Sequence, residues 1–200
     1  MGRPRSGTHA VPTPTRILDA AEVAFGAHPF ALARLAEIGR DAGVRRSSLL
    51  YHFDSKDALH TAVVDRLFED LIGSFTEAVA QGGDLMAIID RLFGTWLRFL
   101  DARPAFAPVV LRGVMDGQGP VRAHLRDRLV PLLDRIEGWI VQAGVVPASV
   151  SVRAALLQIG SDTLVRASAG PLQQPLWGSD HPIVTVRRLF DLPVEGPPAG

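Results

Sequence analysis

Apolar residues recur every three or four positions along most of this 200-residue chain, which is the spacing of one face of an α-helix. The longest such run begins near Lys56 and carries an apolar residue at every fourth position through Val79. Further runs of the same period predict helices over about residues 85–100, 106–115, 121–141, 149–169 and 183–192. The alternation that marks β-strands does not stand out, so the pattern predicts an all-α fold.

Proline and glycine mark the places where these helices should end or bend. Pro131 lies inside the run 121–141 and predicts a kink or a break there unless it begins a new segment, because proline has no backbone N–H and its ring clashes with the preceding turn. Residues 170–182 are rich in proline and glutamine and are expected to form a loop. Residues 193–200 are expected to be a disordered tail.

The chain before Lys56 predicts three shorter helices, over about residues 17–25, 34–41 and 45–52. Thr13 or Thr15 is suited to cap the first of them, because a threonine hydroxyl can accept a hydrogen bond from a backbone N–H of the first turn. These three helices are too short to bury a good core alone. We therefore expect them to share the long helix that begins near Lys56 with the rest of the chain.

The connection between the second and third short helices has the features of a helix-turn-helix. Gly43 suits a position past a helix end that needs a positive φ, and Val44 is the apolar residue that would hold the turn to the core. Leu49 and Phe53 lie four residues apart on one side of the third helix, whose other side is polar and basic. Ser55 is a good N-cap for the helix that follows. A helix presented in this way can enter the major groove of DNA.

This region resembles the DNA-binding head of TetR-type (TetR/AcrR) transcriptional regulators, over roughly residues 14 to 60. The match to the family's sequence pattern is dense and in the same order, and the chain departs from that pattern in three places. Leu50 occupies the usual position of a tyrosine, Tyr51 follows one residue later, and Ser47 replaces a common glycine. Ala33 and Arg34 stand where small hydroxyl residues usually begin the preceding helix. The residues that carry the resemblance are Ile38-Gly39, Ala42-Gly43-Val44, Leu49, Phe53, Ser55-Lys56-Asp57 and Leu59.

The resemblance implies a homodimer whose two heads bind a palindromic DNA operator and whose bodies bind a small-molecule effector. It also implies an N-terminal helix-turn-helix head fused to a C-terminal helical bundle for regulation and dimerisation. The expected organisation is a flexible basic arm at 1–13, the head at 14–60, the ligand-binding and dimerisation domain at 61–192 and the tail at 193–200. The expected output is repression that the effector relieves.

Basic and hydroxyl side chains of the head are the candidates for DNA contacts. Arg45 and Arg46 can pair with guanine or bind phosphate, and they are preferred because the chain has no asparagine for the usual pairing with adenine. Tyr51 and His52 can touch the DNA backbone, although Tyr51 could equally pack inside the head and His52 could be an ordinary surface residue. The further candidates are Ser47, Ser48, Arg34, Lys56 at a helix start, and Arg3 and Arg5 of the arm, for which a solvated tail is the alternative.

Charge and composition limit the other possibilities. The formal net charge is zero, but residues 1–60 contain eight basic and six acidic residues, so the arm and head together carry +2 and the remainder −2. The absence of cysteine fits a reducing cytoplasm, and neither a secretory signal nor a membrane span is expected. The asymmetry between residues 1–60 and the remainder is modest, but it has the right sign for a protein whose N-terminal part faces DNA.

The body offers candidates for an effector pocket and for a dimer interface. Each aromatic candidate could instead be ordinary core. A buried Asp162 would need a partner such as Arg166, four residues on, although an exposed helix pair is the simpler interpretation. The helices at 149–169 and 183–192 could form an intersubunit four-helix arrangement. The pocket candidates are Phe93, Trp96, Phe99, Phe106, Met115, Trp139 and Asp162.

The sequence offers little support for catalysis. It has no glycine-rich phosphate loop, no His-Glu-x-x-His and no Gly-x-Ser-x-Gly motif, so we expect neither enzyme activity nor a cofactor. Asp57 and His60 could share a metal ion, but two ligands without a third make a poor site, so no metal is expected. The alternative function is a ligand-binding helical dimer with a degenerate head that no longer binds DNA, which the departures at Ser47 and Leu50 would explain.

Overall fold

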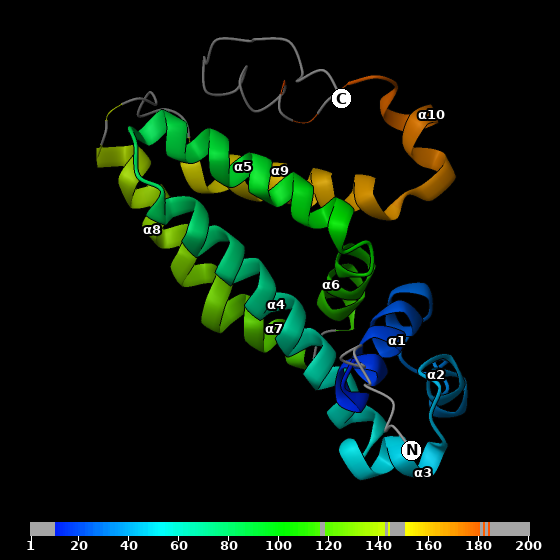
Figure 1. Ribbon diagram of the computed structural model, residues 1–200. Coiled ribbons are helices and arrows are strands. Elements are labelled where there is room, and N and C mark those ends of the chain that lie inside the picture. The colour runs from blue at the N-terminus through cyan, green and yellow to red at the C-terminus, as the bar shows by residue number, and fades with distance from the viewer. Residues whose placement is uncertain are drawn as a thin grey trace, which may run out of the picture. The chain divides into compact units, whose positions relative to one another are not determined.

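A computed structural model describes residues 11–116, 119–142, 144, 151–180, 182 and 184, and every regular element among them is helical (Figure 1). The chain divides into two compact units, Met1–Val63 and Val64–Gly200. The long helix α4, Lys56–Ala80, contributes its first two turns to the first unit and the rest to the second. None of the helices in the described part of the chain combines the length and apolar character that crossing a bilayer requires.

The first unit is a three-helix head closed by the start of α4. Its helices are α1 (Thr13–Ala27), α2 (Leu35–Asp41) and α3 (Arg46–His52), which all contact one another. Apolar residues from all four helices fill the core of this unit, and solvent does not reach the side chains at its centre. These residues are Ile17, Ile38, Leu49, Leu59 and Val63, each 0% exposed.

The predicted cap of α1 is wrong. The helix begins at Thr13 after Pro12, and no side chain accepts a hydrogen bond from its first turn. Instead, the Thr13 hydroxyl accepts a hydrogen bond from the guanidinium of Arg16 at 3.5 Å. Pro14 lies in the first turn, where a missing N–H has no consequence because that group would have no partner within the helix.

The turn between α2 and α3 has the predicted geometry. Gly43 has φ 67°, which confirms the left-handed position, and the N–H of Val44 donates to the carbonyl of Gly39 at 2.8 Å. A Cβ on Gly39 would lie 3.1 Å from the Val44 carbonyl, so glycine there allows α2 to approach the turn closely. The hydroxyl of Ser55 accepts a hydrogen bond from the Ala58 N–H at 3.0 Å, as an N-cap of α4. These contacts fix the direction in which α3 leaves the turn.

The second unit is a helical bundle in which α9 packs against α5, α6 and α8 (Figure 1). Asp84 and Ser151 cap α5 and α9, each accepting a hydrogen bond from a backbone N–H three residues on. The elements after α4 are α5 (Leu85–Ala102), α6 (Phe106–Met115), α7 (Pro120–His124), a π-helical turn (Leu125–Leu129), α8 (Val130–Gln142), α9 (Val152–Ser168), a 3-10 turn (Gly170–Leu172) and α10 (Gln173–Trp177).

Near Pro131, where a kink or a break is predicted, the chain forms a π-helical turn and continues as a helix. This turn, Leu125–Leu129, ends two residues before the proline and separates α7 from α8. In a regular α-helix the ring of Pro131 would meet the carbonyl of Asp127, and the hydrogen bond to that carbonyl could not form. Widening the helix by one residue per turn relieves this conflict while the chain keeps a helical course.

The C-terminal predictions have mixed outcomes. The loop expected over residues 170–182 contains the 3-10 turn and α10, so that prediction is wrong for residues 170–177. Within this span Leu172 and Leu176 remain exposed, which hides the helical pattern that a buried segment would have. The helix predicted at 183–192, apart from residue 184, and the tail at 193–200 lie outside the described residues.

Candidate DNA-binding head and apolar cavity

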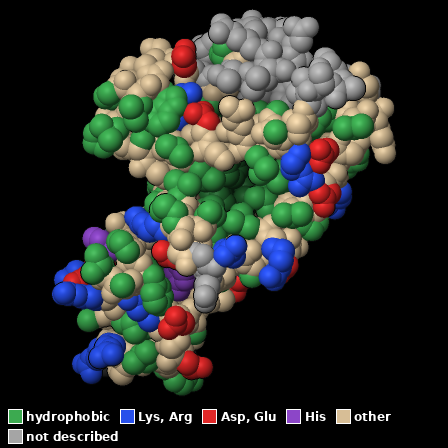
Figure 2. All heavy atoms as spheres, turned by 180° about the vertical axis from the view of Figure 1, so that it is seen from behind, with side chains coloured by type: hydrophobic (Ala, Val, Ile, Leu, Met, Phe, Trp, Pro, Cys, Tyr) green, Lys and Arg blue, Asp and Glu red, His purple; other side chains and the backbone are tan. Residues whose placement is uncertain are grey.

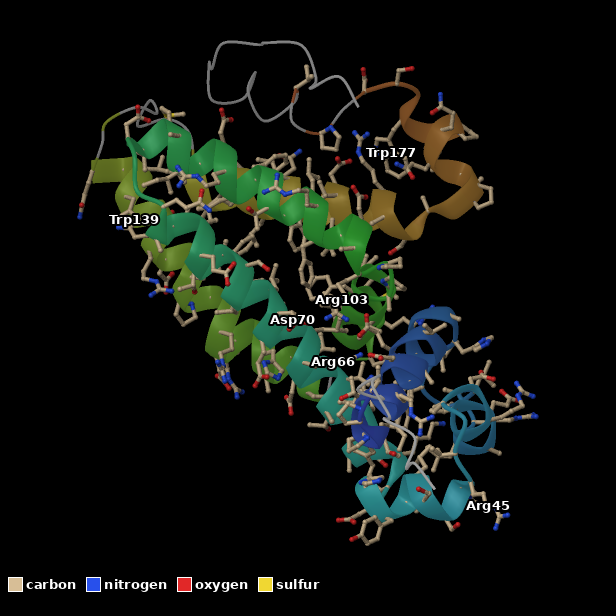
Figure 3. All side chains as sticks on the ribbon, viewed as in Figure 1. Arg45, Arg66, Asp70, Arg103, Trp139 and Trp177 are labelled. Carbon is tan, nitrogen blue, oxygen red and sulfur yellow. The ribbon has the colours of Figure 1, made fainter. Side chains whose placement is uncertain are left out.

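The two arginines at the start of α3 are exposed to solvent. Arg45 is the residue before the helix and Arg46 is its first residue. Figure 3 shows Arg45 pointing away from the head. Within the part of the chain that the structure describes, neither guanidinium has an ion-pair partner. An arginine held at a helix start without a protein partner keeps all its N–H donors available for a phosphate or a guanine.

Tyr51 extends this exposed surface to the end of α3. Its side chain is 83% exposed, so the interpretation that it packs inside the head is wrong. The ring lies edge-on to His52, with 5.2 Å between the ring centroids, and His52 is exposed as well. Ser47 is exposed and Ser48 is half-buried, whereas Leu49 on the opposite side is fully buried. The polar side of α3 therefore presents its candidate DNA contacts on one surface.

Lys56 and Arg34 have partners within the head. The ammonium of Lys56 donates a hydrogen bond to the Ala31 carbonyl at 3.3 Å and lies 4.6 Å from the centre of the Phe30 ring. It therefore ties the loop between α1 and α2 to the start of α4, and its remaining donors are what a phosphate could use. Arg34 is exposed and lies 3.6 Å from the carboxylate of Glu37. The arm residues Arg3 and Arg5 lie outside the described residues.

His60 packs between aromatic rings. Its ring lies 4.8 Å from that of Phe25 and 5.2 Å from that of Phe30, both edge-on. In the described ranges no three metal-binding side chains lie close enough to hold an ion. These ring contacts give His60 a role in the packing of the head.

The second unit contains a cavity of about 310 Å³. Figure 2 shows hydrophobic side chains gathered around a hollow in this unit. Helices α4, α5, α6, α8 and α9 and the π-helical turn all contribute to its wall, and no charged side chain does. The lining residues are Phe68, Leu71, Phe75, Ile89, Leu92, Phe93, Trp96, Phe106, Val110, Val114, Leu125, Leu129, Leu133, Ile136, Ile140, Leu156, Leu157, Ile159, Gly160, Ser161 and Leu164.

Three of the predicted pocket residues, Phe93, Trp96 and Phe106, line this cavity. Phe99 is buried beside it and packs edge-on against Phe106, with 5.1 Å between the ring centroids. Met115 is 75% exposed at the end of α6. These two residues lie outside the lining, as do two further candidates, Trp139 and Asp162.

Most of the wall consists of leucine, isoleucine and valine, which the sequence interpretation did not single out. Leu125, Leu129 and Leu133, for example, follow the same helical period as core residues elsewhere. The period identifies the inward face of a helix, but it does not tell whether that face meets another side chain or an opening. Among the wall residues that were not predicted, Gly160 carries a usable signal, because a glycine inside a helix leaves room where a side chain would stand.

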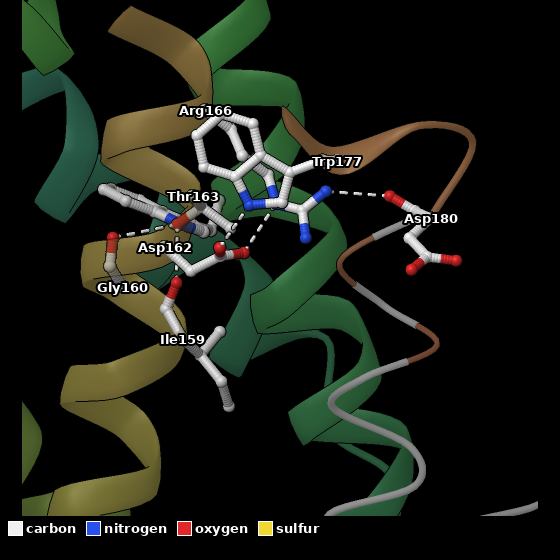
Figure 4. A network of polar contacts seen from close by, with 8 residues as sticks. Ile159, Gly160, Asp162, Thr163, Arg166, Trp177 and Asp180 are labelled. Carbon is white, nitrogen blue, oxygen red and sulfur yellow. Dashed lines mark hydrogen bonds and ion pairs between the residues drawn. The ribbon is translucent and has the colours of Figure 1, made fainter. Parts of the chain in front are cut away.

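Asp162 is held by other protein groups (Figure 4). Its carboxylate accepts hydrogen bonds from the Nε of Arg166 at 2.6 Å and from the indole N–H of Trp177 at 2.9 Å. The Arg166 guanidinium also lies 5.1 Å from the Trp177 ring centre and donates to the Asp180 carbonyl at 2.8 Å. The predicted partner is confirmed, but the pair is not simply exposed, since only 12% of the Arg166 side chain is accessible. The network attaches α10 to α9.

In the N-terminal unit, α3 follows α2 across a glycine turn and carries basic residues on its exposed side, which is the arrangement of a helix-turn-helix. Residues 17–63 match the family model described as bacterial regulatory proteins, tetR family. This match overlaps residues 14–60, the region whose sequence resembles TetR-type regulators.

The similar proteins differ in how much of the chain they match and in whether the match is one of sequence or of fold. The chain is 32% identical over 88 residues to the HTH-type transcriptional repressor KstR2 of Rhodococcus jostii, a match that covers 44% of this chain and only 43% of that protein. The ketosteroid transcriptional regulator KstR2 of Mycobacterium tuberculosis has the same fold over 94% of this chain and 97% of its own, with a TM-score of 0.69 and 16% identity. FadR of Bacillus subtilis, solved with stearoyl-CoA, covers 88% and 95% with a TM-score of 0.67 and 14% identity.

Proposed function

We propose that this protein is a sequence-specific transcriptional repressor of the cytoplasm that leaves a palindromic operator when a small molecule occupies its apolar cavity. The observation that carries the proposal is the exposed basic side of α3, with Arg45 and Arg46 lacking protein partners in the described chain, in the same polypeptide as a helical bundle with an apolar cavity. The relatives named above as repressors and regulators support it.

The head would read DNA through the major groove. An α-helix fits that groove, and arginine forms its commonest specific contact with the O6 and N7 of guanine. Tyr51 and His52 lie at the other end of α3, where they would reach the sugar-phosphate backbone. The exposure of these groups also argues against the alternative of a degenerate head, because both arginines remain on the surface despite the departures at Ser47 and Leu50.

A palindromic site requires two heads about one helical turn, or roughly 34–36 Å, apart, and hence a dimer. Exposed apolar side chains on α8 and α9 are the surface that a second copy would cover, namely Trp139, Val141 and Val165. Scattered apolar residues are ordinary on a surface, but three on two adjacent contacting helices form a candidate isologous interface. Sedimentation at micromolar concentration should give twice the monomer mass, and a monomer would refute this part of the proposal.

Helix α4 is the element through which effector and DNA binding would influence each other. It supplies Lys56 and Leu59 to the head and Phe68, Leu71 and Phe75 to the cavity wall. A ligand changes an equilibrium only by binding one conformation more tightly than the other. A small molecule that favours one position of these α4 side chains would thereby favour one orientation of the helix that carries the head.

The test starts from DNA fragments selected from a random pool by the full-length protein. Binding of the selected duplex is then measured by fluorescence anisotropy for Arg45→Ala and Arg46→Ala, with Arg135→Ala, an exposed cation of α8, as the matched control. We expect each head variant to bind about 10- to 100-fold more weakly, since a good arginine contact contributes roughly 1–3 kcal/mol, and the control to be unchanged. Equal affinity of all four proteins, or selection of no sequence, would contradict DNA recognition by α3.

A further inference from the structure

The polar groups at the cavity wall are already bonded to one another. The indole N–H of Trp96 donates to the Thr163 hydroxyl at 2.7 Å, and that hydroxyl donates in turn to the Ile159 carbonyl at 2.9 Å. The hydroxyl of Ser161 donates to the Leu157 carbonyl at 2.8 Å. No Asp, Glu, Lys, Arg or His lines the cavity. A ligand therefore finds dispersion contacts there but no charged group to pair with.

This wall selects against polar groups inside the cavity. Moving a hydroxyl or an amide from water into an apolar site without a new hydrogen bond is costly, and moving an isolated charge is far more so. Removing hydrocarbon from water is favourable in proportion to the area buried. The part of the ligand that enters must be hydrocarbon, whatever polar group the rest of it carries.

We propose that the ligand is an amphiphile with a hydrocarbon chain of about a dozen carbon atoms in this cavity and its polar end at the cavity mouth. This assignment rests on the proposed function only in taking the cavity as the effector site. The size follows from the volume, because an apolar cavity of about 150 Å³ holds one benzene and 310 Å³ is about twice that.

The mouth is marked by wall residues that also face solvent. Val114 and Leu157 line the cavity while each is 50% exposed, and Ser161 beside Leu157 is exposed as well. A carboxylate, an alcohol or a larger polar group at this point keeps its water. The wall itself therefore sets the length of the chain, and the mouth tolerates different polar ends.

Gly160 sets part of that length. A Cβ on this residue would meet no atom within 4 Å, so its missing side chain leaves usable space at the wall formed by α9. Gly138 on α8 offers a matched control, because its surroundings are equally open but it does not line the cavity. Adding the same side chain at either glycine changes the cavity only in the first case.

The experiment measures binding to the full-length protein by calorimetry without DNA, with n-alkan-1-ols and n-alkanoic acids of six to sixteen carbons below their micelle concentrations. We expect affinity to rise about fourfold for each added methylene and to level off near twelve carbons, with the same slope for alcohols and acids. Gly160→Leu, which adds four carbons to the wall, should move the plateau to chains about four carbons shorter and weaken twelve-carbon binding at least tenfold. Gly138→Leu should leave the series unchanged.

Affinity that does not depend on chain length, or equal effects of the two leucine substitutions, would overturn the proposal. Gly160→Ala, with a predicted plateau about one carbon shorter, serves if the leucine variant does not fold. The failure of this assignment is distinct from that of the proposed function. Chains that bind without releasing selected DNA would leave the ligand class intact and refute effector control. A polar metabolite that releases DNA while chains fail to bind would do the reverse.

Discussion

The head and the bundle are built from the same helical pattern, but they differ in how completely that pattern is filled. In the head, Ile17, Ile38 and Leu49 come from three different helices and are all inaccessible to solvent. In the bundle, residues of the same kinds on α4, α5, α6, α8 and α9 surround a cavity of about 310 Å³. Polar side chains are distributed differently in the two units. The head exposes basic and hydroxyl side chains on α3, whereas the lining of the cavity has almost no polar groups.

This difference corresponds to the two tasks in the proposed function. A helix that must fit a groove of fixed width benefits from a close-packed core behind it, because such a core deforms little and holds the helix in one orientation. A bundle that must respond to a ligand needs a space whose filling favours one arrangement over another. The contrast can be tested by changing the same residue type in both units.

The largest effect is expected when a leucine is truncated in the filled core. Leu49→Ala should lower the free energy of unfolding of the head by about 2–5 kcal/mol, because it creates a new cavity at a fully buried site. Leu133→Ala should lower that of the bundle by less than about 2 kcal/mol, because one side of this half-buried residue already faces open space. Urea titrations followed by circular dichroism measure both values. Equal losses of unfolding free energy would mean that Leu133 is packed as tightly as Leu49 and does not face open space.

A second comparison tests whether loose packing in the bundle is confined to the cavity. Gly113 on α6 is tightly enclosed, since an added Cβ would lie 2.5 Å from the Cβ of Val121 on α7. Gly113→Ala should therefore lower the unfolding free energy by about 1–3 kcal/mol through overpacking. Gly138→Ala, in open surroundings, should instead raise it by up to about 1 kcal/mol through helix propensity.

Val121→Gly provides the control for this pair, because it removes the Cβ and both Cγ atoms that the new methyl group would meet. In a double-mutant cycle the cost of Gly113→Ala should fall when Val121 is already truncated. Strict additivity of the two substitutions would show that the contact between α6 and α7 does not cause the loss.

A smaller effect separates strain from function. Gly43 in the turn of the head and Gly82 in the loop before α5 have nearly the same φ, 67° and 66°. Alanine at either position should cost about 1–2 kcal/mol, because a Cβ disfavours the left-handed region. Only Gly43→Ala should also weaken binding of selected DNA, since only that turn orients α3. Anisotropy titrations of both variants check this, and equal DNA affinities would argue that the turn is not critical for recognition.

The smallest effect concerns an exposed ion pair in the π-helical turn. A hydrogen bond from Arg126, at 2.7 Å, lowers the pKa of the Asp127 carboxyl below its usual 3.8. A carboxyl with a lower pKa in the folded state contributes stability above its unfolded pKa, and this contribution is lost as the pH falls through the folded value. Because both groups are exposed, solvent screens the pair and little stability is at stake.

Asp127→Asn should therefore leave the urea midpoint at pH 7 nearly unchanged and slightly flatten its decline below pH 4. Midpoints measured at pH 3 and pH 7 for both proteins test this. A large loss at pH 7 would mean that this ion pair, and not the packing of Leu125 and Leu129, holds the π-helical turn.

Local features of the sequence were enough to find the head. The positive φ of Gly43, the N-cap at Ser55 and the buried Leu49 each depend on residues a few positions away, so spacing predicts them correctly. The exposed arginines followed from the same reasoning, because the polar side of a short helix is defined by the apolar side. The irregularity near Pro131 was predictable for a similar reason, although its form as a π-helical turn was not.

Only the tertiary structure decided which apolar residues enclose space. Leu133 lines the cavity, Phe99 lies beside it and Leu49 fills a core, yet all three follow the same helical period. The contact of Asp162 with Trp177, fifteen residues away, was equally invisible in the periodicity. Periodicity records which side of a helix turns inward, and it is a property of neighbours along the chain. Whether that side meets atoms or a void depends on the volumes of side chains from helices far apart in sequence, which only their packing brings together.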